Sequence, residues 1–234
     1  MFKLQFYERT IMSDPSVFKR LFVSFKACVD GFLNGCRPFI GVDGCHLKGT
    51  YGGVLLAAVT VDGNKGLFPI AYCVVECECK ESWNFFLCNL YIMLQSVNYV
   101  SPITFMSDKQ KGLCDAISNT FRGCHHRWCS RHLYQNFKSL HPGVLLRKHF
   151  WRVAKASNQF YFDKAMNDMK ATKKEAFDWL SRNTPNMWTR HFSCKSDHIT
   201  NSMTESFNQW IGLYRGKPIL TLIDEIKKKL MNKM

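Results

Sequence analysis

Two short apolar segments, each ending in an aspartate, constrain this chain more than any other feature. They are residues 37–43, RPFIGVD, and residues 102–108, PITFMSD. Apolar and β-branched runs of this length predict buried strands. In open α/β sheets, ligands bind beyond the carboxyl ends of the strands. The sequence therefore predicts a sheet that carries Asp43 and Asp108 at one edge, where two carboxylates indicate a metal site.

The charge of the chain indicates a polyanionic partner. Its 234 residues include 32 Lys and Arg but only 18 Asp and Glu, a net charge of +14. Such an excess attracts polyanions, and nucleic acid is the commonest one that a basic domain meets. A charged surface that only keeps the protein soluble is the alternative. No stretch approaches the roughly 20 apolar residues of a membrane-spanning helix, so no membrane partner is expected.

The 11 cysteines do not predict a disulfide framework. The first ten residues, MFKLQFYERT, have no long apolar core and do not form a signal peptide. A reducing compartment, cytosol or nucleus, agrees better with the odd count. The thiols are then core residues, surface groups or metal ligands.

The N-terminal part of the chain predicts a helix followed by a meander of strands. Apolar residues at spacings of three and four predict a lead-in helix from Ser13 to Leu33. Glycine and Asp-Gly-Asn turns then separate apolar runs that predict an antiparallel meander. The predicted strands are 37–43, 54–61 and 67–75.

A helix and a further strand bring the two aspartates together. The helix is predicted over 81–95, with Ser82 as its N-cap. The strand 103–108 follows, and the right-handed crossover rule places it beside the first strand and parallel to it. Asp43 and Asp108 are therefore predicted to be neighbours.

The rest of the chain is predicted to be mostly helical, and the whole order resembles the ribonuclease H-like fold. In that fold, acids from distant positions hold two divalent ions about 3.5–4 Å apart. A third acid must come from the C-terminal part, where the candidates are Asp197, Glu205, Asp224 and Glu225. Glu205 is preferred because Phe207 and Trp210 can pack inward while Glu205 lies on another helical face. The predicted helices are 110–121, one beginning near Cys129, a helical stretch over 141–183, 202–213 and 220–234, with a short strand at 125–128.

Six long blocks carry a family resemblance that covers nearly the whole chain from about Phe18. They are GCRPFIGVDGCHLKGTYGGVLLAAVTVDGN, FPIAYCVVE, ESWNFFL, SDKQKGL, HHRWCSRHLYQNF and ITNSMTESFNQWI. These blocks resemble the transposase domain of plant Mutator-like elements, the MULE or MuDR group. The resemblance implies a DDE-type core, an α/β ribonuclease H-like mixed sheet with flanking helices and a helical insertion before the last catalytic acid. Carried over by position, Asp43, Asp108 and Glu205 are the catalytic acids and the ligands of Mg²⁺ or Mn²⁺.

The resemblance also implies a function and an organisation. The function is metal-dependent cleavage and transfer of DNA strands in the nucleus, by a homo-oligomer that acts on terminal inverted repeats and target DNA. The implied parts are a lead-in helical segment 1–35, a first core part 36–140, a helical insertion 141–198 and core-completing helices 199–234. Full-length relatives carry a DNA-recognition region before this block and a SWIM-type zinc finger after it, so the chain is expected to be a fragment or a truncated product.

Two other functions stay open. One is a domesticated, non-catalytic nuclear DNA-binding protein or transcription regulator derived from such a transposase, and the retained acids favour the enzyme over it. The other is a plain ribonuclease H-like nuclease, which would use the same metal site but would not join ends to target DNA. Basic and aromatic residues over 141–183, together with Lys227, Lys228 and Lys229, predict contacts with a DNA backbone as a set.

Cysteines and histidines over 124–132 offer ligands for zinc, and Cys129 with His132 matches the family's Cys-x-x-His signature. A tetrahedral site needs four such ligands. Either three or four residues of this cluster converge, or a distant residue such as Cys194 or His198 completes the site. The favoured interpretation is that Cys129 and His132 lock the insertion to the sheet by packing and hydrogen bonding.

Each acid has a structural alternative as well. Asp108 could cap the helix near Gln110, Asp43 before Gly44 could be a turn residue, and Glu205 could be a solvated helix residue. The family blocks place all three acids in the expected order, which favours metal binding.

Overall fold

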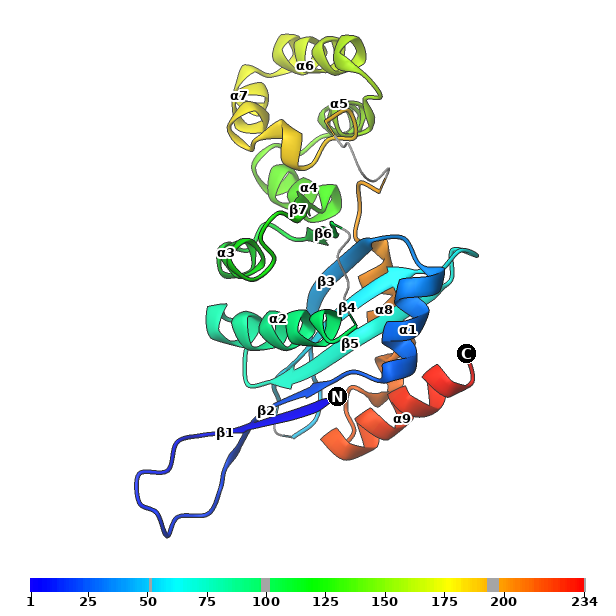
Figure 1. Ribbon diagram of the computed structural model, residues 1–234. Coiled ribbons are helices and arrows are strands. Elements are labelled where there is room, and N and C mark those ends of the chain that lie inside the picture. The colour runs from blue at the N-terminus through cyan, green and yellow to red at the C-terminus, as the bar shows by residue number, and fades with distance from the viewer. Residues whose placement is uncertain (51, 98–101, 193–197, 234) are drawn as a thin grey trace.

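The computed structural model describes residues 1–50, 52–97, 102–192 and 198–233. Its centre is a mixed sheet with the strand order β1-β2-β5-β4-β3-β6-β7 (Figure 1). The pairs β3–β4 and β4–β5 are antiparallel, whereas β6 is parallel to β3 and β7 is parallel to β6. The predicted α/β class, the meander and the placement of β6 are confirmed. The strands are Phe2–Phe6 (β1), Phe18–Val23 (β2), Phe39–His46 (β3), Val54–Val61 (β4), Leu67–Val75 (β5), Thr104–Ser107 (β6) and His125–Trp128 (β7).

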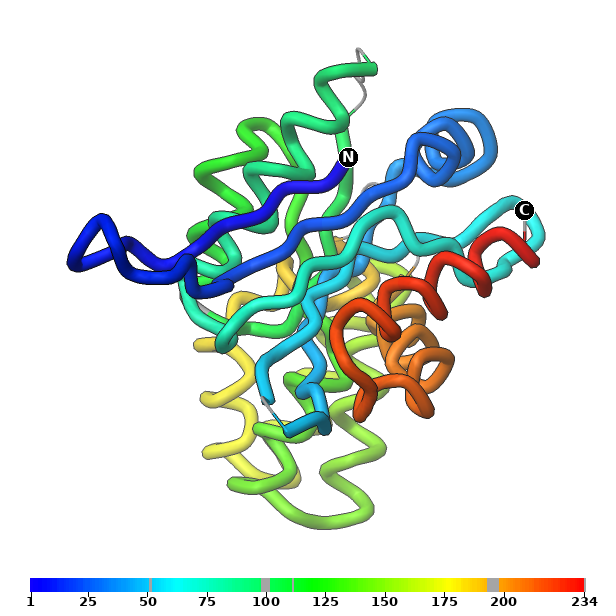
Figure 2. Tube along the Cα trace, turned by 90° about the horizontal axis from the view of Figure 1, so that it is seen from below, coloured from blue at the N-terminus to red at the C-terminus, as the bar shows by residue number. Residues whose placement is uncertain are grey.

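Helices cover both faces of the sheet. Helices α2 and α3 pack on one face, where Phe86 joins strand residues Val42 and Phe105 in one apolar cluster. Helices α8 and α9 pack on the other face, where Phe207 and Leu222 join a second cluster (Figure 2). The helices are Lys26–Gly35 (α1), Lys80–Gln95 (α2), Lys111–Thr120 (α3), Ser130–Leu140 (α4), Val144–Lys155 (α5), Gln159–Thr172 (α6), Lys174–Arg182 (α7), Ser202–Trp210 (α8) and Ile219–Met231 (α9).

Helices α4 to α7 have a separate apolar core beyond β6 and β7 (Figure 1). Phe150 of α5 stacks on Trp188, with ring centroids 5.2 Å apart, and both side chains are fully buried. This core explains why the helices predicted over 141–183 form: each buries an aromatic or aliphatic stripe against the others. No helix in the described residues is long and apolar enough to cross a membrane.

The predicted lead-in helix over 13–33 is wrong in its first half. Phe18–Val23 is strand β2, paired with β1 and β5, and helix α1 begins only at Lys26. Phe22 is buried on the α2 side of the sheet and Leu21 on the α8 side. A strand buried on both faces shows no polar alternation, so its apolar residues can imitate the spacing of a helix.

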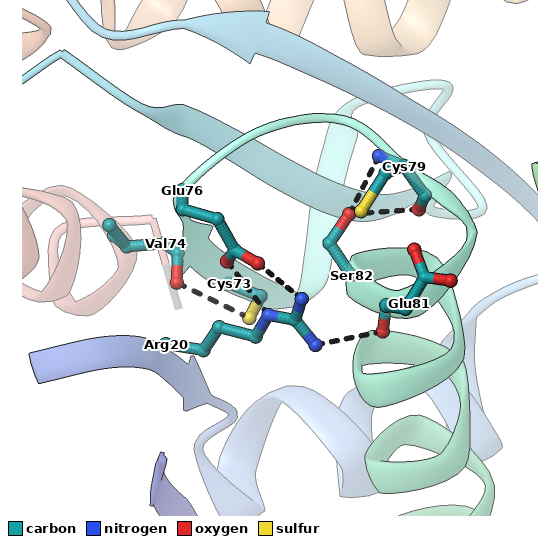
Figure 3. Close-up of polar contacts among 7 residues, drawn as sticks. All are labelled: Arg20, Cys73, Val74, Glu76, Cys79, Glu81 and Ser82. Carbon is teal, nitrogen blue, oxygen red and sulfur yellow. Dashed lines mark hydrogen bonds and ion pairs between the residues drawn. The ribbon is translucent and has the colours of Figure 1, made fainter. Parts of the chain in front are cut away.

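Ser82 is not the N-cap of α2, as the sequence predicted. The N-cap is Cys79, and Ser82 is the third residue of the helix. The Cys79 backbone N–H donates to the Ser82 hydroxyl over 3.0 Å, one half of a capping box (Figure 3). The helix start therefore moves toward β5 and shortens the turn that carries Glu78.

Candidate metal centre

Asp43 and Asp108 lie on neighbouring parallel strands, as predicted. Gly41 of β3 pairs with Met106 of β6, so each aspartate stands two residues beyond a paired position. Since successive side chains alternate between faces, Asp43 shares the face of Gly41, and Asp108 follows Met106 on that face. Met106 packs in the cluster of α8 and α9, which places both carboxyls under α8.

Asp43 does not end its strand, and that part of the prediction is wrong. It pairs with Ala57, and pairing with β4 continues to His46. Gly44, which suggested a turn, is a strand residue instead. The strand that does end at this site is β6, which stops at Ser107, whereas the neighbouring β3 continues to His46.

Asp43 is held by hydrogen bonds and surrounded by charge. Its Oδ1 accepts from the Gly44 N–H over 3.0 Å, and the Thr204 hydroxyl donates to its Oδ2 over 3.2 Å. Burial raises the pKa of Asp43 to about 6; the His132 charge opposes this shift, and the Asp108 charge adds to it. Burial also raises the pKa of Asp108, against the effect of His132 and of the Gln110 backbone N–H.

Asn201 fixes the start of α8 over the two strands. Its side-chain amide donates to the Val42 carbonyl over 3.1 Å and to the Met106 carbonyl over 3.4 Å. A Cβ on Gly41 would lie only 2.1 Å from the Asn201 Oδ1, so the side chain fits because Gly41 has none. A glycine inside a strand often marks such a close approach, and Gly41 is the signal for it in the sequence.

Glu78 is a third carboxyl at this site, and the sequence analysis missed it. It lies between β5 and α2, where a Cβ on Gly44 would come within 3.1 Å of its Oε2. Burial raises the pKa of Glu78, and the charges of Asp108 and Asp43 raise it further. The residues next to Glu78 in the sequence do not indicate that it approaches β3, because this approach depends on where α2 begins.

His132 and Cys129, at the start of α4, form a charged pair beside the acids. Hydrogen bonding to Cys129 raises the pKa of His132 to about 9, and the charges of Asp43 and Asp108 add to this shift. Burial alone would raise the pKa of Cys129, but the His132 hydrogen bond and the Asn201 N–H outweigh it and lower that pKa. The Asn201 N–H donates to the Cys129 Sγ over 3.2 Å. The pair thus joins α4 to the start of α8 and places one positive charge near the carboxyls.

Glu205, the predicted third acid, is engaged elsewhere. Its carboxylate accepts a hydrogen bond from the Arg131 guanidinium in an ion pair, and 27% of its side chain is exposed. Helix α8 instead contacts Asp43 through Thr204, the residue that precedes Glu205. Within the described part of the chain, Asp43, Asp108 and Glu205 do not form a set whose ligand atoms all lie within 4.8 Å of one another.

The other C-terminal acids offer no better partner. Asp224 and Glu225 both pair with Lys228 on α9. Asp197 lies outside the described residues. Glu205 therefore stays the candidate on α8.

Zinc has little support from the thiols. Over the described ranges, Cys129 and His132 have no third ligand within the same 4.8 Å limit. His198 stacks on Phe39, with ring centroids 4.8 Å apart, and Cys194 lies outside the described residues. A closed zinc site needs four ligands, so zinc at the Cys-x-x-His signature stays a prediction.

A separate group of possible metal ligands consists of Glu76, Cys77 and Cys79. Within the described residues, it is the group of three whose ligand atoms all lie within 4.8 Å of one another. Arg20, only 4% exposed, bonds both Glu76 oxygens, and its Nε donates to Oε2 over 2.8 Å (Figure 3). Glu76 is thus committed to a buried ion pair between β2 and the end of β5. Two thiols remain, which is too few for a closed site.

One comparison with known proteins assigns a segment of the chain to a family. Residues 39–136 match a family model described as the MULE transposase domain. This segment is a Mutator-like transposase domain. It contains Asp43, Glu78, Asp108, Cys129 and His132, and a transposase domain of this kind implies interaction with DNA. A search of curated proteins found no match. Glu205 lies beyond the matched segment.

The carboxyls of this domain fit a hard divalent cation. Magnesium and manganese prefer carboxylate and water oxygens. Asp43 and Asp108 supply carboxylates on the α8 side of the sheet, and their charges also act on the nearby carboxyl of Glu78. All three pKa values are raised, mainly because burial disfavours their charged forms. One imidazolium does not balance three carboxylates, so a cation would find uncompensated negative charge here.

Proposed function

We propose that this chain is the catalytic core of a DDE-type DNA transposase with a ribonuclease H-like arrangement of its sheet. The observation that carries the proposal is the convergence of Asp43 and Asp108 from adjacent parallel strands inside the Mutator-like domain. The excess of basic residues over the chain supports a polyanionic substrate. Terminal repeats and target DNA are the proposed substrates, in the nucleus and by a homo-oligomer.

In the proposed reaction, water attacks a phosphodiester at a transposon end and the P–O3′ bond breaks. The freed 3′ hydroxyl then attacks a phosphodiester of the target, where a P–O3′ bond breaks and the target's 3′ oxygen leaves as a hydroxyl. Mg²⁺ or Mn²⁺ held by Asp43 and Asp108 would supply the Lewis acid that activates the nucleophile and stabilises the leaving oxygen. Glu78 or Glu205 would complete the ligand set.

The protein groups around the acids have separate roles in this proposal. Thr204 fixes the rotamer of Asp43 through its hydroxyl. His132 supplies a fixed positive charge that keeps the two aspartates ionised. Asn201 anchors the start of α8 to β3 and β6, next to the aspartates. Glu205, the residue after Thr204, then faces Arg131 of α4.

The pairing of Glu205 with Arg131 favours a second candidate function. A transposase-derived DNA-binding protein needs no metal, and an acid neutralised by arginine is the state expected where the catalytic set is not assembled. In that case the chain binds DNA and does not cut it.

A nicking assay separates the two functions. The purified chain is incubated with supercoiled DNA and with terminal-repeat DNA, in Mg²⁺, in Mn²⁺ and in EDTA. A catalytic core nicks only with metal, and Asp43→Asn and Asp108→Asn abolish the nicking. The exposed Asp163 of α6 gives the control, Asp163→Asn, which retains activity.

Three outcomes are informative beyond activity itself. Nicking that persists in both aspartate variants would refute the assigned site. DNA binding in EDTA without nicking in any metal supports the non-catalytic protein. Joining of cut ends to target DNA separates a transposase from a plain nuclease.

A further inference from the structure

Between α4, α5 and the residues that lead into α8 lies a cavity of about 660 Å³, here named the α4–α5 cavity. Aromatic and basic side chains line it, and none of the described lining residues is acidic. Its volume is within the range of small-molecule and nucleotide sites. The lining side chains that matter are Arg131, Tyr134, Arg147, Trp151 and Lys155.

Trp151 forms a rigid wall of this cavity. Its ring lies 5.7 Å from the Tyr134 ring and 5.5 Å from the Phe150 ring, measured between centroids. Phe150 is fully buried, so the Trp151 ring rests on the core of the helical part. An aromatic face held in this way binds a nucleobase by stacking and has little entropy to lose.

Basic residues surround this aromatic wall on both sides. A second cavity, of about 450 Å³, shares Trp151 and Lys155 with the first. Lys148 and Arg152 line this second cavity, and Arg152 also pairs with Asp168 over 2.7 Å. Cations on either side of an aromatic ring match a nucleotide, whose base stacks and whose phosphates accept charge-assisted hydrogen bonds.

The α4–α5 cavity adjoins the candidate metal centre through the start of α8. Arg131 lines the cavity and bonds Glu205, and Thr204, the residue before Glu205, donates to Asp43. Thr200 also lines the cavity, and the next residue, Asn201, bonds the carbonyls of Val42 and Met106. A strand with a phosphate at the acids would therefore pass the cavity mouth.

We propose that the α4–α5 cavity binds an unpaired nucleotide of the DNA strand next to the phosphate that is cut, with its base stacked on Trp151. A base inside a duplex is covered on both faces by its neighbours, so only an unpaired or flipped base can enter a cavity and stack on its wall. The proposal rests on the proposed function for its DNA, but the cavity binds its nucleotide without metal.

Binding of short oligonucleotides in EDTA tests the proposal. Three DNAs are compared by fluorescence anisotropy: a single strand, a duplex with an unpaired end, and a fully paired duplex. The parent protein favours the first two, and 2-aminopurine at the unpaired position changes its emission on binding because the base stacks.

Substitutions at Trp151 and Lys155, each with a control on α6, localise this binding. Trp151→Ala weakens the affinity for unpaired DNA by roughly fivefold or more and leaves that for paired duplex unchanged, while Trp151→Phe keeps most of it. Phe160→Ala, an exposed aromatic on α6, is the matched control and binds like the parent. Lys155→Ala, at an exposed cation, lowers the salt dependence of binding to unpaired DNA by about one ion, whereas Lys164→Ala, at an exposed cation on α6, leaves that salt dependence unchanged.

Equal affinity of the parent for all three DNAs overturns the proposal. So does a Trp151→Ala protein, folded by circular dichroism, that binds unpaired DNA like the parent or loses all three DNAs alike. Asp108→Asn separates this result from the proposed function, since it abolishes nicking and leaves the preference for unpaired DNA intact. Nicking without such a preference leaves the function standing and removes the cavity.

Discussion

Replacing Asp43 by asparagine should stabilise the metal-free protein while it abolishes any metal-dependent activity. Asp43 is an ionised carboxyl in a half-buried position, and its pKa is raised from 3.8 to about 6. A raised carboxyl pKa means that the folded state binds the proton more tightly than the unfolded state. The ionised group therefore destabilises the fold at neutral pH, and asparagine, of the same shape and without the charge, removes that cost.

The size of the effect follows from the shift. A difference between about 6 and 3.8, at 1.36 kcal/mol per unit, amounts to about 3 kcal/mol at pH 7.5 as an upper value. For a chain of this length, that free energy raises the melting temperature by roughly 6–12 °C. The gain is fully present above the folded pKa and declines as pH falls toward 3.8, because the parent aspartate then takes up a proton. At pH 5 about half of it remains.

Thermal and urea unfolding in EDTA, at pH 5.0 and 7.5, measure this difference. Asp163→Asn, at an exposed aspartate, is the control and leaves stability unchanged. Adding Mg²⁺ should raise the melting temperature of the parent and not that of Asp43→Asn, because the cation offsets the buried charge only where the charge exists. An Asp43→Asn protein that is no more stable than the parent at pH 7.5, or equally so at both pH values, refutes the reasoning.

Three further changes test the packing and ligands of the acids and the separate ion pair at the end of β5. Gly41→Ala should destabilise the fold by about 1–3 kcal/mol in urea unfolding, since its Cβ would press on Asn201; a neutral result contradicts the packing of α8 on β3. Glu78→Gln should weaken Mn²⁺ binding, followed by electron paramagnetic resonance, about tenfold, and unchanged affinity removes Glu78 from the ligand set. Arg20→Ala should cost about 1.5–3 kcal/mol because it removes the partner of the half-buried Glu76. A loss below 1 kcal/mol in the same unfolding assay would show that water replaces the guanidinium.

Much of the sheet could be predicted because its strands are bounded by turn residues. The strands 54–61 and 67–75 begin and end where the sequence predicted, next to glycine and Asp-Gly-Asn turns. The neighbouring position of Asp43 and Asp108 followed from the crossover rule alone. The strand 18–23 was missed because both of its faces are buried, which removes the alternation that identifies a strand.

The site was predicted less completely, since its geometry depends on contacts between distant segments. Glu78 reaches the acids because α2 begins at Lys80 and turns the preceding residues toward β3. Glu205 was selected by its helical face and then by family position, and nothing local to it indicates that Arg131 lies opposite. A sequence pattern reports which residues are present on one element, whereas an ion pair between α4 and α8 depends on how the two helices pack.

Helix α4 connects the three features that matter for the proposed chemistry. His132 faces the aspartates, Arg131 holds Glu205, and Tyr134 lines the α4–α5 cavity. Arg131 also lines that cavity, so Glu205 and a DNA phosphate would compete for one guanidinium. A phosphate that binds Arg131 releases the Glu205 carboxylate, which is then one residue from the Thr204 that bonds Asp43. If both proposals hold, entry of the DNA strand is what frees the third acid, and the ion pair in the DNA-free protein is the resting state of the same site.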